Sequence, residues 1–350
     1  MSECYEAVAL RQFAEGLMLG AGFPKPAAAC VAEILVEGDL MGHTTHGLQM
    51  LSPYLKSVES GGLSVSGEPE ILSDAGATML WDGRYLPGPW VAVRAIEEAI
   101  QRIPEQGLVS VNITRCHHLA CLQAYLLRAT EKGYAMLLMC SDPSVSTVAP
   151  FGGLKPLYTP NPLAAGFPTH EDPILIDISM SITTNGNTMR SHAQGDRLAG
   201  AWIQSAQGQA TDDPGELFAD PPGSLLPLGG QEYGHKGFAL GLLVECLTSA
   251  LAGAGRSEKP EKWGSAVFMQ IIDPGRFGGE EAFLRETTWL SEACRANPVP
   301  EGRDKVRMPG ERGLKRRRER LKRGIPLYPG ILKGLKKWAD RYQVALPKPL

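Results

Sequence analysis

The segment His43-Thr44-Thr45-His46-Gly47 is the first stretch of the chain whose residue types could do chemistry. Two histidines three residues apart share one face of a helix and could bind a metal. The usual zinc helix instead spaces its histidines by four with a glutamate between them, and no third ligand can be identified here. We therefore predict no metal site.

An imidazole also suits proton transfer, because its pKa lies close to neutral pH. We assign this acid–base role to His46, since Gly47 directly after it lets another backbone or a ligand approach closely. For His43 we favour a structural role, either as a helix cap or as a residue satisfied in the core.

A second histidine pair, His117 and His118, lies between an expected strand and an expected helix. Backbone N–H groups and the helix dipole converge at such junctions, so ligands often bind there. Adjacent side chains diverge, and we expect one member of the pair to face a site. The pattern alone leaves a structural and a catalytic role equally open.

Two glycine-rich segments could hold a ligand. Residues 149–168, APFGGLKPLYTPNPLAAGFP, predict a rigid irregular loop. In residues 225–243, glycines and Lys236 open a long apolar helix, which resembles a phosphate cradle. The spacing is not that of a P-loop, and no G-x-G-x-x-G follows a strand, so a standard Rossmann fold is not supported.

Residues 312–323 are strongly basic, since eight of the twelve are Lys or Arg. Without aromatic residues to stack on bases, we interpret the segment as a solvated helix face and not as a nucleic-acid contact. Some of these cations could still meet a cofactor phosphate.

Hydrophobic spacing predicts the elements that position these groups. Helices are expected at 4–21, 26–41 and 47–58, and from about residue 70 the sequence pattern changes to short runs of residues that favour strands. Strand–helix alternation then predicts an α/β layer. We expect the basic C-terminal stretch to pack back on the N-terminal helices. The remaining strands are expected at 77–83, 107–114, 134–141, 173–181 and 265–273, and the remaining helices at 90–103, 119–133 and, as a buried helix, 236–253.

Composition limits the binding partners and the cellular compartment that we expect. The 350 residues carry a net charge of −3 and are 43% hydrophobic, which gives no reason to expect nucleic acid or an anionic membrane. No apolar run reaches the roughly 18 residues of a membrane span, and the first residues do not resemble a signal peptide. The seven cysteines are scattered without a C-x-x-C, so we expect neither disulfides nor a cysteine zinc site and assign the chain to the cytoplasm.

Taken together, these stretches resemble the type-2 malate/L-lactate dehydrogenase family, also called sulfolactate dehydrogenase-like oxidoreductases. The resemblance covers nearly the whole chain. Residues 45–51 resemble the family's S-H-G-x-x-R-L, and residues 116–120 resemble its S-H-H-F-G or S-N-H-F-G. APFGG, NPLA, LIDISMS, TDDP, LLPLGG, GHKG and the late PGE follow in the family's order.

The resemblance implies a three-layer αβα, non-Rossmann sheet domain at residues 71–311. A smaller helical domain would combine residues 1–70 with 312–350. The protein would be a homodimer that transfers a hydride between NAD or NADP and a small 2-oxo or 2-hydroxy acid, without nucleic acid, membrane or metal.

The resemblance also implies site residues. His46 would be the proton donor and acceptor, with His118 as the second active-site histidine and Thr45 beside the substrate. The cofactor would contact Ser141, Asp142, Asp177, Ile178, Ser179, Met180, Ser181, His235, Lys236, Glu311 and Arg312.

This sequence departs from the family pattern at the substrate end. Met50 stands where the family has an arginine that would pair with the substrate carboxylate. Either another cation holds the carboxylate, or the substrate carries its acid group elsewhere. A member that binds a dinucleotide or metabolite without turnover, and an imino-acid reductase, are the alternatives.

Overall fold

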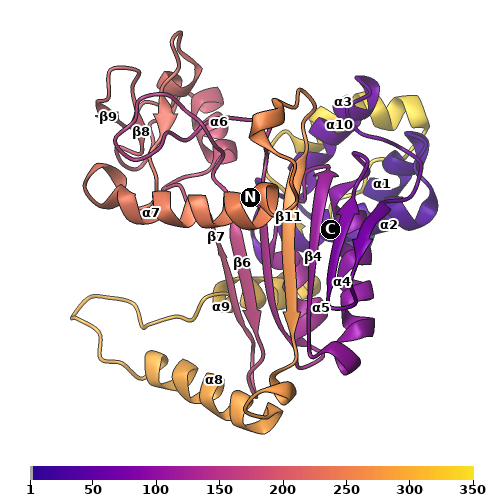
Figure 1. Cartoon of the computed structure of the whole chain (residues 1–350). Coiled ribbons are helices and arrows are strands. Elements are labelled where there is room, and N and C mark those ends of the chain that lie inside the picture. Colours follow the sequence, from indigo (N-terminus) through magenta and orange to yellow (C-terminus); the bar gives the residue numbers. More distant parts are fainter. Residues whose placement is uncertain (1–2) are drawn as a thin grey trace.

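The computed structural model describes residues 3–350 as a mixed α/β chain built around one seven-stranded sheet (Figure 1). The strand order is β2-β3-β4-β11-β5-β6-β7. Only β3 and β4 run parallel, and the other neighbouring pairs are antiparallel. The sheet therefore differs from the parallel sheet of a Rossmann domain. Its strands are β2 (Glu70–Asp74), β3 (Thr78–Asp82), β4 (Leu108–Cys116), β5 (Ala135–Ser141), β6 (Leu163–Phe167), β7 (Ile174–Ile178) and β11 (Ser265–Ile272).

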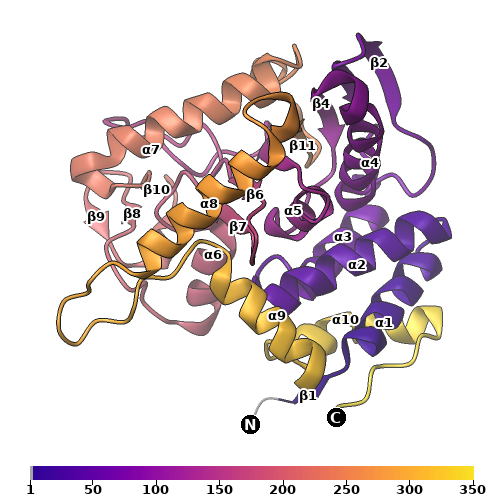
Figure 2. The same cartoon turned by 90° about the horizontal axis from the view of Figure 1, so that it is seen from below.

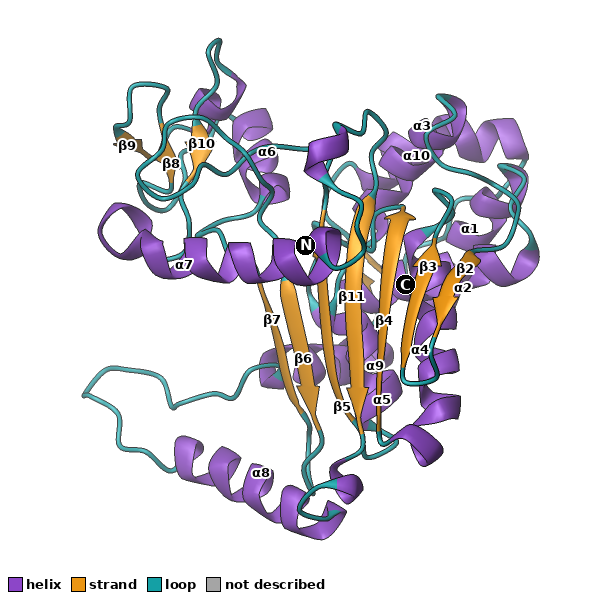
Figure 3. Ribbon diagram, in the orientation of Figure 1, coloured by secondary structure: helices purple, strands orange, loops and turns teal. Residues whose placement is uncertain are grey.

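Helices cover the sheet and form a separate group at one side (Figure 3). A small three-stranded sheet of β8 (Ile203–Gln204), β9 (Ala210–Thr211) and β10 (Ser224–Leu225) lies beside α6. The helices are α1 (Ala7–Gly20), α2 (Lys25–Met41), α3 (Leu51–Glu59), α4 (Gly88–Gln106), α5 (Gln123–Thr130), α6 (Asn185–Gln194), α7 (Gly230–Glu245), α8 (Glu280–Arg295), α9 (Glu311–Arg323) and α10 (Ile331–Tyr342).

The alternation of side chains along β11 shows the three layers. Val267 and Met269 point into the main core, which also contains buried residues of α2, α4 and α5. Phe268, between them, faces the opposite side and packs with Val244 of α7. Because successive strand residues point to opposite faces, helices cover both faces of the sheet. The predicted three-layer α/β class is confirmed.

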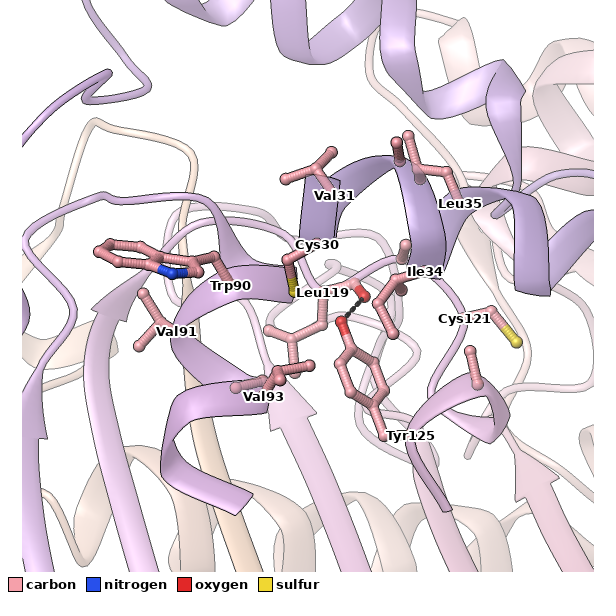
Figure 4. Packing of buried hydrophobic residues seen from close by; sticks show 14 of the residues in the cluster. Cys30, Val31, Ile34, Leu35, Trp90, Val91, Val93, Leu119, Cys121 and Tyr125 are labelled. Atoms are coloured by element: carbon pink, nitrogen blue, oxygen red, sulfur yellow. Dashed lines mark hydrogen bonds between the residues drawn. The ribbon is translucent and has the colours of Figure 1, made fainter. Parts of the chain in front are cut away.

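The main core joins the N-terminal helices to the sheet domain (Figure 4). Cys30 and Ile34 of α2 lie against Trp90 of α4 and Tyr125 of α5, all inside one buried cluster. Each large apolar side chain buried here contributes about 1.5–3 kcal/mol relative to an exposed one. The hydroxyl of Tyr125 donates to the carbonyl of Leu119, which fixes the segment that follows β4.

The two ends of the chain meet in the smaller helical region (Figure 2). β1 (Cys4–Tyr5) pairs with β12 (Ile325–Pro326), and the Leu350 N–H donates to the Cys4 carbonyl over 2.8 Å. Arg317 of α9 donates to Glu37 of α2. The expected return of the C-terminal stretch to the N-terminal helices is therefore confirmed. The domain boundaries themselves, 1–70 with 312–350 against 71–311, stay a prediction, and residues 1–2 lie outside the described residues.

Two expectations about local structure were wrong. Residues 149–168 are not wholly irregular, because β6 begins at Leu163 and pairs with β5 and β7. The apolar helix expected at 236–253 is not buried in this chain, since Leu243 is 44% exposed and Leu251 60% exposed. The basic helix α9 presents most of its cations to solvent, as expected, while Arg317 pairs with Glu37 and Arg318 with Asp172.

Candidate active site

A tight turn after α2 positions His46. Gly42 ends the helix in the left-handed region, at φ 96°, where glycine has no steric penalty. Gly47 then packs on the buried carboxylate of Asp39, and a Cβ at Gly47 would lie 2.3 Å from its Cγ. The Leu48 N–H donates to the same carboxylate over 2.7 Å. The close approach expected at Gly47 is therefore made by Asp39.

The sheet register brings the second histidine pair to this turn. Cys116, the last residue of β4, pairs with Ser265 at the start of β11, so the chain leaves the sheet directly into His117 and His118. The rings of His118 and His46 lie 5.8 Å apart between centroids and are inclined by 21°. Thr45 Oγ1 lies 2.9 Å from Nδ1 of His46. Two segments far apart in sequence thus form one imidazole pair.

The hydrogen bonds of His118 determine its tautomer. The Ala120 N–H, 3.1 Å away, can only donate, so Nδ1 of His118 is an acceptor and the neutral ring carries its proton on Nε2. The Tyr54 hydroxyl donates to the His118 carbonyl over 2.9 Å and lies 3.0 Å from Nδ1. His118 is therefore held as a neutral donor beside His46.

His117 lies in a different direction from His118. It is fully buried, and its Nε2 lies 3.1 Å from Ser57 Oγ. The Trp263 ring, just before β11, lies 4.6 Å from the His117 ring and 5.2 Å from that of His118. Trp263 therefore packs against the whole pair, while His118 is the member that adjoins His46.

Burial keeps both imidazoles neutral at neutral pH. Desolvation, reinforced by the charges of His43 and Arg190, lowers the pKa of His46 to about 4. Burial also lowers the pKa of His118 well below its ordinary value, and His46 and His117 add to that shift. Each protonated imidazole would therefore be a strong acid, ready to give its proton to an oxygen that gains negative charge.

A buried carboxylate, Asp39, and an arginine, Arg190, adjoin the turn that carries His46. Burial raises the pKa of Asp39 to about 7, against the opposing effects of the Leu48 N–H, Arg320 and Arg190. Arg190 of α6 donates to Thr44 Oγ1 over 3.2 Å and to the Gln49 side chain. α6 therefore contacts the His46 turn on both sides of the imidazole.

His43 belongs to a polar cluster next to the site. Its Nε2 lies 2.8 Å from Gln123 Oε1, and the ligand atoms of His43, Cys121 and Asp177 lie within 4.8 Å of one another. Asp177 Oδ2 accepts the Gln123 N–H over 2.9 Å and the Cys121 thiol over 3.7 Å. Burial raises the pKa of the Cys121 thiol well above its ordinary value. These groups satisfy one another as protein contacts, and the prediction of no metal site is left untested.

The residues expected at the cofactor occupy several environments. Ser141 is buried, and its hydroxyl lies 2.9 Å from Thr248 Oγ1 and 3.0 Å from Ser249 Oγ. Asp142 accepts from the Ser144 N–H and hydroxyl, while burial raises its pKa. Both lie at the end of β5 nearest the start of β11, because Ser141 pairs with Ala266.

The expected residues at the end of β7 and just after it differ in exposure. Ile178 is 43% exposed, whereas Met180 is buried with Val244 of α7. The Ser179 hydroxyl donates to the Ser181 carbonyl over 2.8 Å, and the Ser181 hydroxyl donates to the Thr183 carbonyl over 2.6 Å. This segment runs from the polar cluster at Asp177 towards α7.

The other expected cofactor residues lie on α7 and at the start of α9. His235 and Lys236 are exposed on α7, where the His235 ring lies 5.7 Å from Phe151. Glu311 begins α9 and accepts from the Met308 N–H over 3.1 Å, which lowers the pKa of Glu311. Arg312 is exposed beside it. The contacts within residues 3–350 do not connect these residues with His46.

Tyr54, Trp263, Asp39 and Arg190 were not singled out from the sequence. A tryptophan at the entrance of a strand signals a packed strand end, but nothing in the local pattern links Trp263 to His118. Arg190 lies in the polar segment 183–200, where the family motifs match poorly. The fold alone brings these side chains to the imidazole pair.

Comparison with known proteins identifies the fold and the family. The sequence profile of the malate/L-lactate dehydrogenase family matches residues 5–336. The chain belongs to this family. It is 29% identical to an L-lactate dehydrogenase of Cupriavidus necator over 96% of this chain and 97% of that protein.

Two further members cover most of the chain. The (2R)-3-sulfolactate dehydrogenase (NADP(+)) of Chromohalobacter salexigens is 32% identical over 85% of this chain and 87% of that protein. The crystal structure of malate dehydrogenase from Entamoeba histolytica superposes with a TM-score of 0.92 at 25% identity, covering 99% of this chain and 100% of that one. The family resemblance inferred from the motifs is confirmed.

Membership in a dehydrogenase family implies a nicotinamide cofactor, and the residues around His46 fit one. Gly186, at the start of α6, faces Thr45, since a Cβ built there would lie 3.3 Å from Thr45 Cβ. Asn185 Oδ1 and Arg190 Nε on the same helix are buried and have no hydrogen-bond partner among residues 3–350. Asn185 Oδ1, an unpartnered acceptor on the helix that contacts the His46 turn, suits a donor such as the N–H of a carboxamide.

Proposed function

We propose that this chain is an NAD- or NADP-dependent dehydrogenase that interconverts a small 2-oxo acid and its 2-hydroxy acid, with His46 exchanging the proton. The observation that carries the proposal is the stacked pair of buried, neutral imidazoles, His46 and His118, in a chain of the malate/L-lactate dehydrogenase family.

The two histidines have different parts in the proposed reaction. A reduced nicotinamide held here would supply a hydride to the carbonyl carbon, and negative charge would then develop on the carbonyl oxygen. Protonated His46 donates its proton to that oxygen and becomes neutral; in the reverse direction neutral His46 takes the hydroxyl proton. The Nε2–H of His118 donates a hydrogen bond to the same oxygen, and the Thr45 hydroxyl orients His46 through Nδ1.

We infer from the family resemblance that Ser141, Asp142, the segment Asp177–Ser181, His235 and Lys236 of α7, and Glu311 and Arg312 of α9 would hold the cofactor. The start of α9 would offer N–H groups, and Lys236 and Arg312 would offer positive charge, both suited to a dinucleotide.

The test is turnover by the purified full chain. NADH and NADPH are each mixed with a panel of small 2-oxo acids, and loss of the reduced nicotinamide absorbance is followed. We expect turnover with at least one acid, and a loss of at least 100-fold on His46→Gln, as expected for a general acid. Absence of turnover on the whole panel, with no cofactor binding by calorimetry, would contradict the proposal.

We also propose a homodimer in the cytoplasm. Leu242, Leu243 and Leu251 expose apolar surface along α7 and the π-helical turn Cys246–Ala250 that follows it. A second copy would cover this face. No helix within residues 3–350 is long and apolar enough to cross a membrane, and no disulfide joins two cysteines within these residues. Light scattering on a size-exclusion column should give twice the mass of the chain, and Leu243→Glu should reduce that mass to one chain.

A further inference from the structure

Arg190 places a guanidinium against the turn that carries His46. Its two terminal nitrogens donate to Thr44 Oγ1 and to Gln49 Oε1, on either side of that histidine. Its central carbon lies 3.8 Å from the centre of the Tyr328 ring, a cation–π contact that fixes the plane of the group. The side chain is thus held in one place although it is long and flexible.

The charge of Arg190 acts on His46 in the turn and on Asp39 of α2. It adds to the effect of burial and of His43 in lowering the pKa of His46, and it opposes the effect of burial on Asp39. Burial in turn lowers the pKa of Arg190 itself. Because the pKa of Asp39 is about 7, this carboxyl group is partly protonated at neutral pH and neutralises the guanidinium incompletely.

Arg190 retains hydrogen-bonding capacity for a ligand. A guanidinium has five N–H donors in one plane, and the protein contacts above use two of them. The Nε–H is buried and finds no acceptor within the part of the chain that the structure describes. A buried donor without a partner is costly, unless a ligand supplies the acceptor. Met50, on the same turn, carries no donor.

We propose that Arg190 binds the carboxylate of the substrate and so makes this site selective for 2-oxo acids over uncharged carbonyl compounds. This proposal rests on the dehydrogenase function proposed above. A planar guanidinium matches a carboxylate through two parallel hydrogen bonds, and the half-buried setting strengthens them. Substrate binding brings a negative charge that opposes the effect of Arg190 on His46, so binding itself makes His46 easier to protonate.

A purely structural role for Arg190 would give a different result. If the guanidinium only tethers α6 to Thr44 and Gln49, then its loss disturbs His46 and slows every substrate alike. If it binds the carboxylate, its loss acts on acids and spares the corresponding amides. The ratio of kcat/KM for a 2-oxo acid to that for its amide separates the two roles.

The experiment compares the full-length protein with Arg190→Met and Arg190→Lys, and with Arg197→Met as a matched control. Arg197 is an exposed arginine that follows α6, the helix of Arg190, and it pairs with Asp212 and Asp213. Binding of oxamate, an unreactive isostere of the three-carbon 2-oxo acid pyruvate, is measured by calorimetry in the presence of NADH or NADPH. The acid-to-amide ratio is measured in parallel.

We expect Arg190→Met to weaken oxamate binding by on the order of 100-fold and to lower the acid-to-amide ratio by a similar factor, as for loss of one partner in a buried charged contact. Arg190→Lys should recover part of the binding, and Arg197→Met should match the wild type. Equal loss on acid and amide, or wild-type protein that does not bind oxamate, would overturn the carboxylate proposal. Oxamate binding that depends on Arg190 in a protein without turnover would uphold the carboxylate contact while refuting the dehydrogenase function.

Discussion

The pH dependence of the two reaction directions tests the role of His46 most directly. Burial, aided by the charges of His43 and Arg190, lowers the pKa of His46 from the ordinary 6.5 to about 4. At pH 7 about one His46 in a thousand is then protonated. The free energy of protonating His46 at this pH is therefore roughly 4 kcal/mol, at 1.36 kcal/mol per pKa unit. Protonating an imidazole of ordinary pKa at the same pH would cost less than 1 kcal/mol, by the same conversion.

The direction of each pH dependence follows from the protonation state of His46 that the reaction direction needs. Reduction of the 2-oxo acid uses protonated His46, so its kcat/KM should fall about tenfold per pH unit from pH 5 to 8. Oxidation of the 2-hydroxy acid uses neutral His46, so its kcat/KM should stay level with respect to this group over the same range. The profile of kcat/KM reports the form of the protein that meets the substrate, here the complex with cofactor.

The assay is initial-rate kinetics at saturating cofactor in both directions, in buffers of constant ionic strength. His46→Gln serves as the control, because its residual rate should lose the pH slope. A reductive profile that is level below pH 6 and bends near pH 6.5 would refute the reasoning. It would mean that the imidazole is hydrated in the working complex, and that burial in the free chain does not describe it.

Three further predictions concern stability, measured by denaturant unfolding. Gly47→Ala should cost about 1–3 kcal/mol and reduce turnover, because its Cβ would overlap the Asp39 carboxylate, whereas Gly278→Ala has open space and should change little. The folded-state pKa of Asp39, about 7, exceeds its ordinary 3.8, so the native state binds the extra proton and stability should fall as pH rises from 4 to 7, by at most about 4 kcal/mol. Asp39→Asn should remove that dependence, and an unchanged slope would contradict the assignment. Leu335→Ala in the fully buried face of α10 should cost about 2–5 kcal/mol, while Lys333→Ala on its exposed face should stay within about 0.5 kcal/mol.

Periodic hydrophobic patterns predicted the elements that carry the core. The α2 helix has apolar residues at helical spacing and a proline in its first turn, and both signals are local, although its last eight residues are buried on every side. The strands β4, β5 and β11 have apolar runs long enough to be recognised singly. Their order and direction in the sheet were not predicted, because antiparallel and parallel pairing depend on the paths of the connections between them.

Chemistry at the site was only partly predictable for the same reason. His46 and His118 were chosen from residue type, local glycine and family motif, and the fold brings their rings together. Asp39 was missed because a carboxylate within an apolar helix gives no local sign of the glycine that packs on it. The exposure of α7 was mispredicted because apolar residues on all sides of a helix indicate burial without saying whether one chain supplies the cover.

β1 pairs with β12, and α1 and α2 pack with the last two helices. The amino-terminal core can therefore be completed only after those last helices have been synthesised. Translation produces the apolar faces of α1 and α2 long before it produces α9 and α10. At 5–20 residues per second, roughly 15–60 s of synthesis separate the two. The nascent chain must therefore keep its first helices from aggregating through that interval, and a ribosome stalled before residue 311 would hold a product that cannot close its own amino-terminal core.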